Sequence, residues 1–379
     1  MTLERQSPLD GTPGNRKYVR VSCQQCSEPP CVRVCPTGAA HIDPATNIVT
    51  MDNSRCVGCK YCIAACPYNV RYINSETKVA DNCDFCLKTK LANGEEPACV
   101  QACRHGALYF GDVNDPQSII SRLLRVKDTV RIRPHLGTEP SLRLRHRSER
   151  RSLIMLDFTI GLTEGVAWPW PIAVYLFLAG ISGGAVAVAI CVNLFRGVHL
   201  NTPIMKAATL IGFITIVLGM ICLVLDLTNP LFFWRILVYY NPTSVMSIGV
   251  MALLFYIPLV FVLMCVALQQ EITSVSWLKW LDPIISFFAK FRVALDWIVL
   301  ILAIAICAYT GFLISALIRF PLINTAVLPA LFVASGFSAG CAATKVLAAW
   351  LFGADRHGSD LHVLHAAEWP IMAVEALCL

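Results

Sequence analysis

The chain has 379 residues, of which 31 are Lys or Arg and 25 are Asp or Glu, and its mean hydropathy is +0.60. Residues 1–151 contain 22 of the 31 basic residues and 12 of the 18 cysteines, whereas residues 152–379 are mostly apolar. The length excludes one small domain, and the net charge of +6, which comes from the first part without any base-reading motif, excludes nucleic acid as a partner.

The twelve cysteines of the first part fall into three groups of four. These are Cys23, Cys26, Cys31 and Cys35, then Cys56, Cys59, Cys62 and Cys66, and finally Cys83, Cys86, Cys99 and Cys103. The second group ends at Pro67 and has the spacing of bacterial ferredoxins. A disulfide scaffold does not group its cysteines in this way. A four-cysteine zinc site remains as the alternative, but it needs neither the third close cysteine nor two Cys-Pro endings. The spacing therefore predicts [4Fe–4S] clusters.

The predicted clusters exchange ligands between the first two groups. In such runs three closely spaced thiolates bind one cluster, and the cysteine before proline binds its neighbour. One cluster is expected to take Cys23, Cys26, Cys31 and Cys66, and the other Cys56, Cys59, Cys62 and Cys35. In the third group, Cys83, Cys86 and Cys99 are expected to bind a further cluster. Cys103, which is followed by Arg104 instead of proline, would need a partner cluster. We therefore expect about three clusters.

Residues 21–145 resemble the four-cluster electron-transfer subunits of molybdopterin oxidoreductases, such as dimethyl sulfoxide, polysulfide and tetrathionate reductases. The matching stretches are CQQCSEPPCVRVCPTGA, DNSRCVGCKYCIAACPYNVR and DNCDFCLKTKLANGEEPACVQAC. The resemblance implies a ferredoxin-like fold and a separate molybdopterin-containing catalytic subunit as partner. Members of that family carry a further cysteine quartet upstream, whereas no cysteine precedes Cys23 here. We therefore expect either a shortened N-terminus or the loss of the fourth cluster.

A basic segment separates the cysteine groups from a series of apolar runs. Residues 122–151 contain ten Lys or Arg, which are expected to form a solvated face and to attract anionic lipid headgroups. Apolar runs near 172–194, 207–227, 244–268, 295–318 and 328–352 are each long enough to cross a bilayer, and a sixth covers 361–379. The expected fold is an α+β double ferredoxin-like iron–sulfur domain (1–121), a basic juxtamembrane linker (122–165) and an all-α transmembrane helical bundle (166–379).

The apolar part resembles the NrfD-like, polysulfide-reductase-type membrane anchor. The matching stretches are EGVAWPWPIAVYLFLAGISGGA, DLTNPLFFWRILVYYNPTSVMSIG, YTGFLISA and LPALFVASGFSAGCAA. The resemblance implies an anchor without haem that exchanges electrons with menaquinone or ubiquinone. Members of that family usually have eight or more helices and keep the two parts on separate polypeptides. Further subunits that complete the bundle or a fourth cluster are therefore an open expectation.

Connectivity predicts where the quinone binds. The iron–sulfur domain leads directly into the first span, so the start of that span and the end of the second lie on one rim. Asp226 is predicted to exchange protons with the quinone, and Arg235 to donate hydrogen bonds to its oxygens. Trp170 and Tyr175 are predicted to line the same pocket. The same rim holds Glu164, Trp168, Trp234, Tyr239, Tyr240 and Arg319. The alternative for each aromatic residue is the ordinary interfacial belt. That alternative is weaker for Asp226, because ionisable groups at membrane depth are costly and usually functional.

Three further ionisable residues are expected toward the opposite side of the membrane. Asp296, Lys345 and Glu368 could form a proton path, or two of them an intramembrane salt bridge. The single cysteines of the apolar part are expected to be small packing residues. These are Cys191, Cys222, Cys265, Cys307, Cys341 and Cys378.

The charges give conflicting predictions of sidedness in a bacterial inner membrane. The basic linker favours a cytoplasmic iron–sulfur domain by the positive-inside rule. The short loops favour the reverse. Those far from the domain carry Arg196, Lys206, Lys279, Lys290, Arg292 and Arg356, and those on its side carry only Arg235 and Arg319. Together with the family precedent, the loops favour the periplasmic side.

The combined interpretation is a membrane-bound subunit that carries electrons between quinone and a molybdopterin-type catalytic subunit in anaerobic respiration. No complete substrate-reducing site is visible in this sequence, so the terminal substrate is not predicted. Two alternatives stay open. The protein could be a redox-coupled proton-translocating quinone module, or a structural anchor whose clusters feed another quinone-binding subunit.

Overall fold

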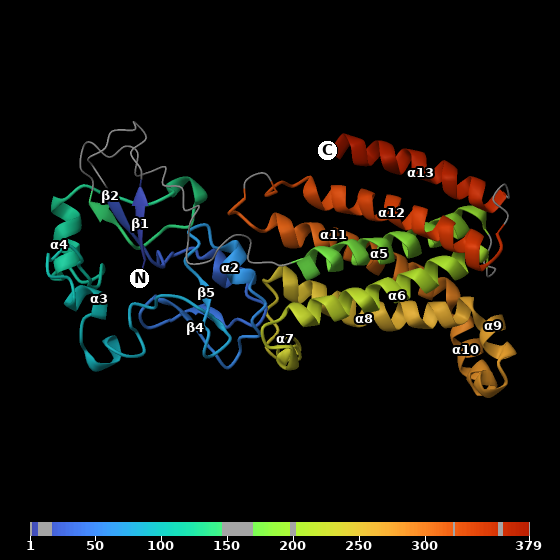
Figure 1. Cartoon of the computed structure of the whole chain (residues 1–379), viewed down its shortest axis with the longest axis horizontal. Helices are drawn as coiled ribbons and strands as arrows, with labels where there is room; N and C mark the ends of the chain where they lie inside the picture. The colour runs from blue at the N-terminus through green and yellow to red at the C-terminus, as the bar shows by residue number, and fades with distance from the viewer. Residues whose placement is uncertain are drawn as a thin grey trace. The chain divides into compact units, whose positions relative to one another are not determined.

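The computed structural model describes residues 2–6, 17–145, 170–197, 202–320, 323–354 and 359–378 (Figure 1). The protein divides into two compact units, residues 1–167 and 168–379. The first combines short strands with short helices, and the second is helical, which confirms the predicted fold class. Glu164 and Trp168 of the predicted rim, and Arg147, Arg150 and Arg151 of the linker, lie outside the described residues.

The first unit repeats a small motif of one helix and one hairpin. Helix α1 (Pro30–Arg33) precedes the antiparallel strands β3 (Ala40–Ile42) and β4 (Val49–Met51), and helix α2 (Tyr61–Ala65) precedes β5 (Tyr72–Ile73) and β6 (Ala80–Asp81). The remaining elements are the hairpins β1 (Thr2–Gln6) with β2 (Lys17–Val21) and β7 (Thr129–Val130) with β8 (Leu144–Arg145), the helices α3 (Ala98–Gln101) and α4 (Ile119–Val126), and the 3-10 turns η1 (Leu91–Asn93) and η2 (Pro134–Leu136).

Local sequence explains the ends of the short helices. Pro30 occupies the first turn of α1, where its missing N–H costs nothing. Pro36 and Pro67 follow the cysteines that come after α1 and α2, because proline cannot continue a helix. Two-stranded sheets are only marginally stable alone. The core of the unit instead contains eight cysteines, seven of them fully buried and Cys59 half-buried, with Tyr61 and Tyr68 beside them.

The second unit contains five helices long and apolar enough to cross a membrane, counted over the described residues. They are α5 (Trp170–Arg196), α6 (Pro203–Asp226), α8 (Val245–Ala267), α11 (Arg292–Ser315) and α12 (Leu328–Leu351). Each matches one of the five predicted runs, with ends displaced by a few residues. The sixth run is helix α13 (Ser359–Cys378), which is not among these five candidates. Shorter elements connect them: η4 (Pro230–Phe232), α7 (Arg235–Val238), α9 (Gln269–Ser274), η5 (Ser276–Leu281) and α10 (Asp282–Ala289).

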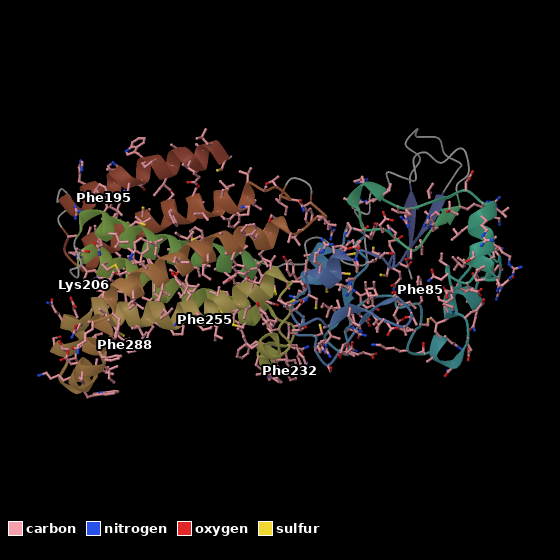
Figure 2. All side chains as sticks on the ribbon, turned by 180° about the vertical axis from the view of Figure 1, so that it is seen from behind. Phe85, Phe195, Lys206, Phe232, Phe255 and Phe288 are labelled. Carbon is pink, nitrogen blue, oxygen red and sulfur yellow. The ribbon has the colours of Figure 1, made fainter. Side chains whose placement is uncertain are left out.

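Helix α5 is the centre of this bundle, where it packs against α6, α11 and α12. Glycines permit the closest approach: a Cβ on Gly184 would overlap the carbonyl of Gly336 on α12, and one on Gly340 would overlap the backbone of Ala185. Small residues at such seams are typical of membrane bundles, whose packing is driven by van der Waals contact. Apolar side chains such as Phe195 and Phe255 are exposed on the outside (Figure 2). The second unit is thus a multi-pass membrane bundle.

Candidate iron–sulfur and quinone sites

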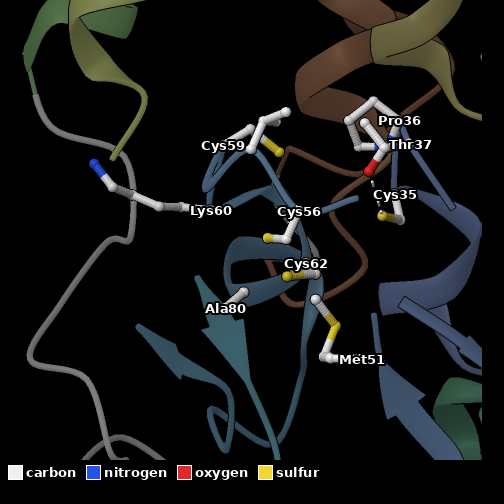
Figure 3. A pocket seen from close by; sticks show the side chains of 10 residues that line it. Cys35, Pro36, Thr37, Met51, Cys56, Cys59, Lys60, Cys62 and Ala80 are labelled. Carbon is white, nitrogen blue, oxygen red and sulfur yellow. Dashed lines mark hydrogen bonds between the residues drawn. The ribbon is translucent and has the colours of Figure 1, made fainter. Parts of the chain in front are cut away.

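The structure gathers the eight thiols of the first two cysteine groups into two sets. Cys23, Cys26 and Cys66 belong to one buried cluster, and Cys31 lies within electrostatic range of all three. We call Cys23, Cys26, Cys31 and Cys66 the first set. Cys35, Cys56, Cys59 and Cys62 line one pocket (Figure 3) and form the second set. Each set takes three cysteines from one group and the fourth from the other. That these two sets bind clusters stays a prediction.

The same backbone turn occurs in the first Cys-x2-Cys pair of each cysteine group. The residue before the second cysteine has a positive φ in each case, at 49° for Gln25, 72° for Gly58 and 55° for Phe85. A left-handed residue in such a turn directs successive N–H groups into a concavity that binds anions. The third cysteine group therefore has the same local geometry as the first two.

A second turn follows the last cysteine of each group. Gly38, Asn69 and Gly106 each lie three residues after that cysteine and have positive φ values of 61°, 50° and 53°. The backbone then returns an amide toward the sulfur. The N–H of Ala40 donates to Cys35 Sγ at 3.3 Å, and the N–H of Ala107 donates to Cys103 Sγ at 3.3 Å. Such N–H···S contacts stabilise negative charge on sulfur, as an iron–sulfur cluster requires.

Burial makes the two sets chemically suited to a metal cluster. Burial, with a smaller contribution from neighbouring thiols, raises the pKa of Cys26 and of Cys62 to about 12. Isolated thiols with such pKa values would stay protonated at neutral pH, whereas bound iron ionises them. Four thiols per set with inward amides therefore fit a [4Fe–4S] cluster.

The spacing of the thiols within a set also bears on the choice of metal. Within the described ranges no three His, Cys, Asp or Glu side chains converge on a single ion. The ligands of one zinc ion must converge in this way. The four thiolates of a cubane instead bind four different irons, so they stand farther apart. Which metal the two sets bind stays a prediction.

The third cysteine group is more open than the first two. Cys83, Cys86, Cys99 and Cys103 are all half-buried, and Cys83 packs against the first set. The pKa of Cys103 is lowered, chiefly because the amide of Ala107 donates to its sulfur. Cys103 is thus prepared to bind a cation, although it lies in neither set.

One buried charge beside the thiols was not singled out from the sequence. Arg71 is only 1 % exposed, and its Nη1 donates to the Met51 thioether at 3.0 Å. The signal was present, because Arg71 is the only charged residue in the stretch from Cys66 to Ile73. Charged residues are almost never fully buried unless they are paired.

Two of the four predicted quinone residues are buried in the helical bundle. Tyr175 on α5 is fully buried and contacts α6 at Gly219. Asp226 is 8 % exposed at the end of α6. It follows Gly219 by two helical turns, about 10 Å along the same face. Tyr175 and Asp226 therefore lie along one α5–α6 seam.

The other two lie near the same end of the bundle, where Trp170 is exposed and Arg235 is half-buried. Trp170 begins α5 and is 74 % exposed. Arg235 begins α7, and its guanidinium carbon lies 3.9 Å from the centroid of the Phe232 ring. Trp234, Tyr239 and Tyr240 are exposed as well, which fits the interfacial belt as well as a quinone pocket. Tyr175 does not fit that belt, because it is buried within the bundle.

The structure separates the three ionisable residues expected on the opposite side. Lys345 on α12 forms an ion pair with Glu368 on α13, and His365 Nδ1 lies 3.4 Å from the same carboxylate. Asp296 instead lies 3.8 Å from Arg292 Nε, one turn away on α11. The sequence allowed either a proton path or a salt bridge between two of these residues. The structure contains the salt bridge, between Lys345 and Glu368. Among the single cysteines, Cys307 and Cys341 are buried in helix contacts, whereas Cys191 is exposed.

Comparison with known proteins assigns a family to each part of the sequence. The family model "Polysulphide reductase, NrfD" matches residues 159–379, and "4Fe-4S dicluster domain" matches residues 15–113. The sequence is 40 % identical to the C subunit of polysulfide reductase from Wolinella succinogenes over 217 residues, which are 56 % of this protein and 68 % of that one.

Two relatives match shorter stretches. The sequence is 52 % identical to protein NrfC of Escherichia coli (strain K12) over 143 residues, 38 % of this protein and 64 % of NrfC. It is 51 % identical to the thiosulfate reductase electron transfer subunit PhsB of Salmonella typhi over 115 residues, 30 % of this protein and 58 % of PhsB. The match thus spans less than two thirds of either relative. The dicluster match supports [4Fe–4S] clusters over the zinc alternative.

Proposed function

Because the protein belongs to the polysulphide reductase NrfD family and carries a 4Fe–4S dicluster domain on the same polypeptide, we propose that it conducts electrons between membrane quinone and a catalytic partner subunit in anaerobic respiration. The observation that carries the proposal is the presence of two four-thiol sets and a five-span bundle in one polypeptide. The first unit would hold iron–sulfur clusters, which carry one electron each, and the helical bundle would bind quinone within the membrane.

In the first unit, the protein's task is to hold and shield the clusters. The bound clusters would supply one-electron transfer. Cys23, Cys26, Cys31 and Cys66 would hold one, and Cys35, Cys56, Cys59 and Cys62 the other. The inward amides, such as that of Ala40, stabilise the negative sulfurs. The half-buried third group would hold a third cluster through Cys83, Cys86 and Cys99, with Cys103 available to another.

In the second unit, Asp226 and Arg235 are the proposed proton-handling and oxygen-binding residues. Quinone reduction takes up two electrons and two protons, so a titratable group must reach the ring oxygens. Asp226 is nearly buried at the end of α6. Tyr175 lies on the same seam and Trp170 near its end, which together would supply an aromatic wall for the ring. Menaquinone or ubiquinone would be the exchangeable partner.

The partner subunit follows from the relatives' names. PhsB is an electron transfer subunit of a thiosulfate reductase, and the Wolinella succinogenes relative belongs to a polysulfide reductase. A separate catalytic subunit, of molybdopterin type by the resemblance of residues 21–145, would therefore accept or supply the electrons. The short-loop charges support a periplasmic position for the iron–sulfur domain, in a bacterial inner membrane.

A liposome experiment tests the electron path. The full-length protein is reconstituted in liposomes without quinone, its clusters are reduced with dithionite, excess dithionite is removed, and oxidised menaquinone is then added to half of the sample. Menaquinone should restore the oxidised cluster absorbance, whereas liposomes without quinone should not. Reduced clusters that stay reduced with menaquinone present would contradict the proposal and favour the structural-anchor alternative. Proton movement across the membrane beyond the two protons that each quinone takes up on reduction would favour the proton-translocating alternative.

A further inference from the structure

Arg71 is a fully buried cation with too few partners among the described residues. In sequence it directly precedes strand β5, and its side chain is 1 % exposed. Its Nη1 contacts Met51 Sδ at 3.0 Å, while Nε and Nη2 are buried without a hydrogen-bond partner in the described part of the protein. The thiol of Cys31, in the first set, interacts with this guanidinium, so the two free donors lie beside that set.

The physical cost of this arrangement implies an anion. A guanidinium does not lose its proton in proteins, so Arg71 stays charged. An unpaired buried charge is strongly unfavourable. The Met51 thioether cannot offset that cost, because its sulfur is a weak acceptor without charge. An anionic acceptor must therefore face Nε and Nη2.

Arg71 lies close to both thiol sets. Its guanidinium is within electrostatic range of Cys23, Cys31 and Cys66 of the first set and of Cys62 of the second. Met51, which it contacts, lines the pocket of the second set with Cys35 and Cys56 (Figure 3). The anions that the thiol sets would hold are [4Fe–4S] clusters, whose sulfurs accept hydrogen bonds.

We propose that Arg71 is a redox-tuning residue shared by both clusters. The free guanidinium nitrogens donate to sulfur of the cluster in the first set, and the same charge lies close to the cluster in the second. Reduction adds one electron to a cluster and makes it more negative by one charge. A nearby cation stabilises that reduced form and raises the potential. The charge of Arg71 thereby reduces the repulsion between the two anionic clusters and raises the reduction potential of each. This inference rests on the proposed function, because it requires both clusters.

The test compares Arg71→Gln, which removes the charge, with Arg71→Lys, which keeps it. Arg33→Gln is the matched control. Arg33 is two residues from Cys31 and from Cys35 in sequence, but its side chain is 70 % exposed and pairs with Glu28. The full-length protein is purified, its iron and sulfide are counted, and the potentials are measured by redox titration followed by electron paramagnetic resonance.

Arg71→Gln should lower the reduction equilibrium constant of both clusters at least tenfold, about 59 mV for one electron. Arg71→Lys should recover most of that loss, and Arg33→Gln should cause none.

Each other outcome has a defined meaning. Full iron content with an unchanged potential for either cluster in Arg71→Gln would overturn the shared role. If Arg71→Gln loses its iron, Arg71→Lys decides: retained clusters with near wild-type potentials support the role of the charge, and lost clusters show a purely structural role. Wild-type protein without iron and sulfide would contradict the proposed function itself.

Discussion

Cys56 and Cys103 occupy different surroundings although both belong to groups with similar spacing. Cys56 is buried in the second set, where burial raises its pKa, so its thiol needs a metal to ionise. Cys103 is half-buried and lies in neither set, and backbone amides lower its pKa. Replacing each cysteine with serine should therefore have different effects on iron content and on stability.

Cys56→Ser should remove one cluster, roughly four irons per polypeptide, and destabilise the first unit, because buried ligands lose their metal. Cys103→Ser should leave the iron content within experimental error of wild type if its partner cluster is absent. Iron and sulfide analysis with thermal unfolding makes the comparison. Equal losses in both variants would show that Cys103 binds a cluster, completed by another subunit or by residues outside the described ranges.

Asp226→Asn tests the proposed quinone site. The substitution keeps the shape and hydrogen bonding but removes proton exchange. Quinone-linked turnover should fall by roughly 10²-fold, the usual scale for a lost general acid or base. Cluster reduction by dithionite should stay normal.

Glu368→Gln provides the matched comparison for this site, since it removes a carboxylate that the structure pairs with Lys345. It should change quinone turnover far less than Asp226→Asn. Wild-type quinone turnover in Asp226→Asn, together with lost turnover in Glu368→Gln, would show that the quinone site lies at the opposite side of the bundle.

At the scale of elements, the α5–α12 seam determines how tightly the bundle closes. Gly184 and Gly336 place two backbones against each other with no room for a side chain. Gly184→Val should therefore destabilise the bundle by about 1–3 kcal/mol or more, because overpacking forces backbone shifts. Thermal unfolding in detergent measures the effect.

Ala173→Val is the control on the same helix, since Ala173 is exposed on the outside of α5. It introduces the same valine side chain where nothing opposes it, and should be nearly neutral. A Gly184→Val variant no less stable than Ala173→Val would contradict the tight seam, because valine is a better helix former than glycine and only overpacking can make Gly184→Val unstable.

The turns around the cysteines explain how short elements build a precise site. Gln25, Gly58 and Phe85 adopt the same left-handed conformation at the same position of three loops. The third group repeats this geometry without the burial of the first two. Its loop is therefore formed for a cluster even though few neighbouring side chains enclose it.

For the whole molecule, the number of clusters decides between the interpretations of the third group. If all three groups are filled, iron and acid-labile sulfide should each reach about twelve per polypeptide. A value near eight would show that the third group is empty. Stoichiometric zinc with little sulfide would contradict the iron–sulfur assignment, so metal analysis should precede every other measurement.

Most of the architecture was predictable from the sequence, because it depends on local patterns. The Cys-x2-Cys spacing predicts a cluster loop within a few residues, and runs of more than twenty apolar residues predict spans by length alone. The five membrane helices and the ferredoxin-type unit were predicted on this basis and are confirmed. Quinone binding and the ligand roles of the cysteines stay predictions.

Only the tertiary structure decided which side chains meet. Arg71 follows the second group in sequence, yet its proximity to thiols of both sets depends on how α1 and α2 pack against each other. The pairing of Lys345 on α12 with Glu368 on α13 depends on how these two helices pack, whereas Arg292 and Asp296 are one turn apart on α11 and meet through local helix geometry. The burial of Tyr175 and exposure of Trp170, five residues apart on α5, likewise depend on the neighbouring helices. Local spacing determines an element, but a contact between elements depends on packing that no short stretch contains.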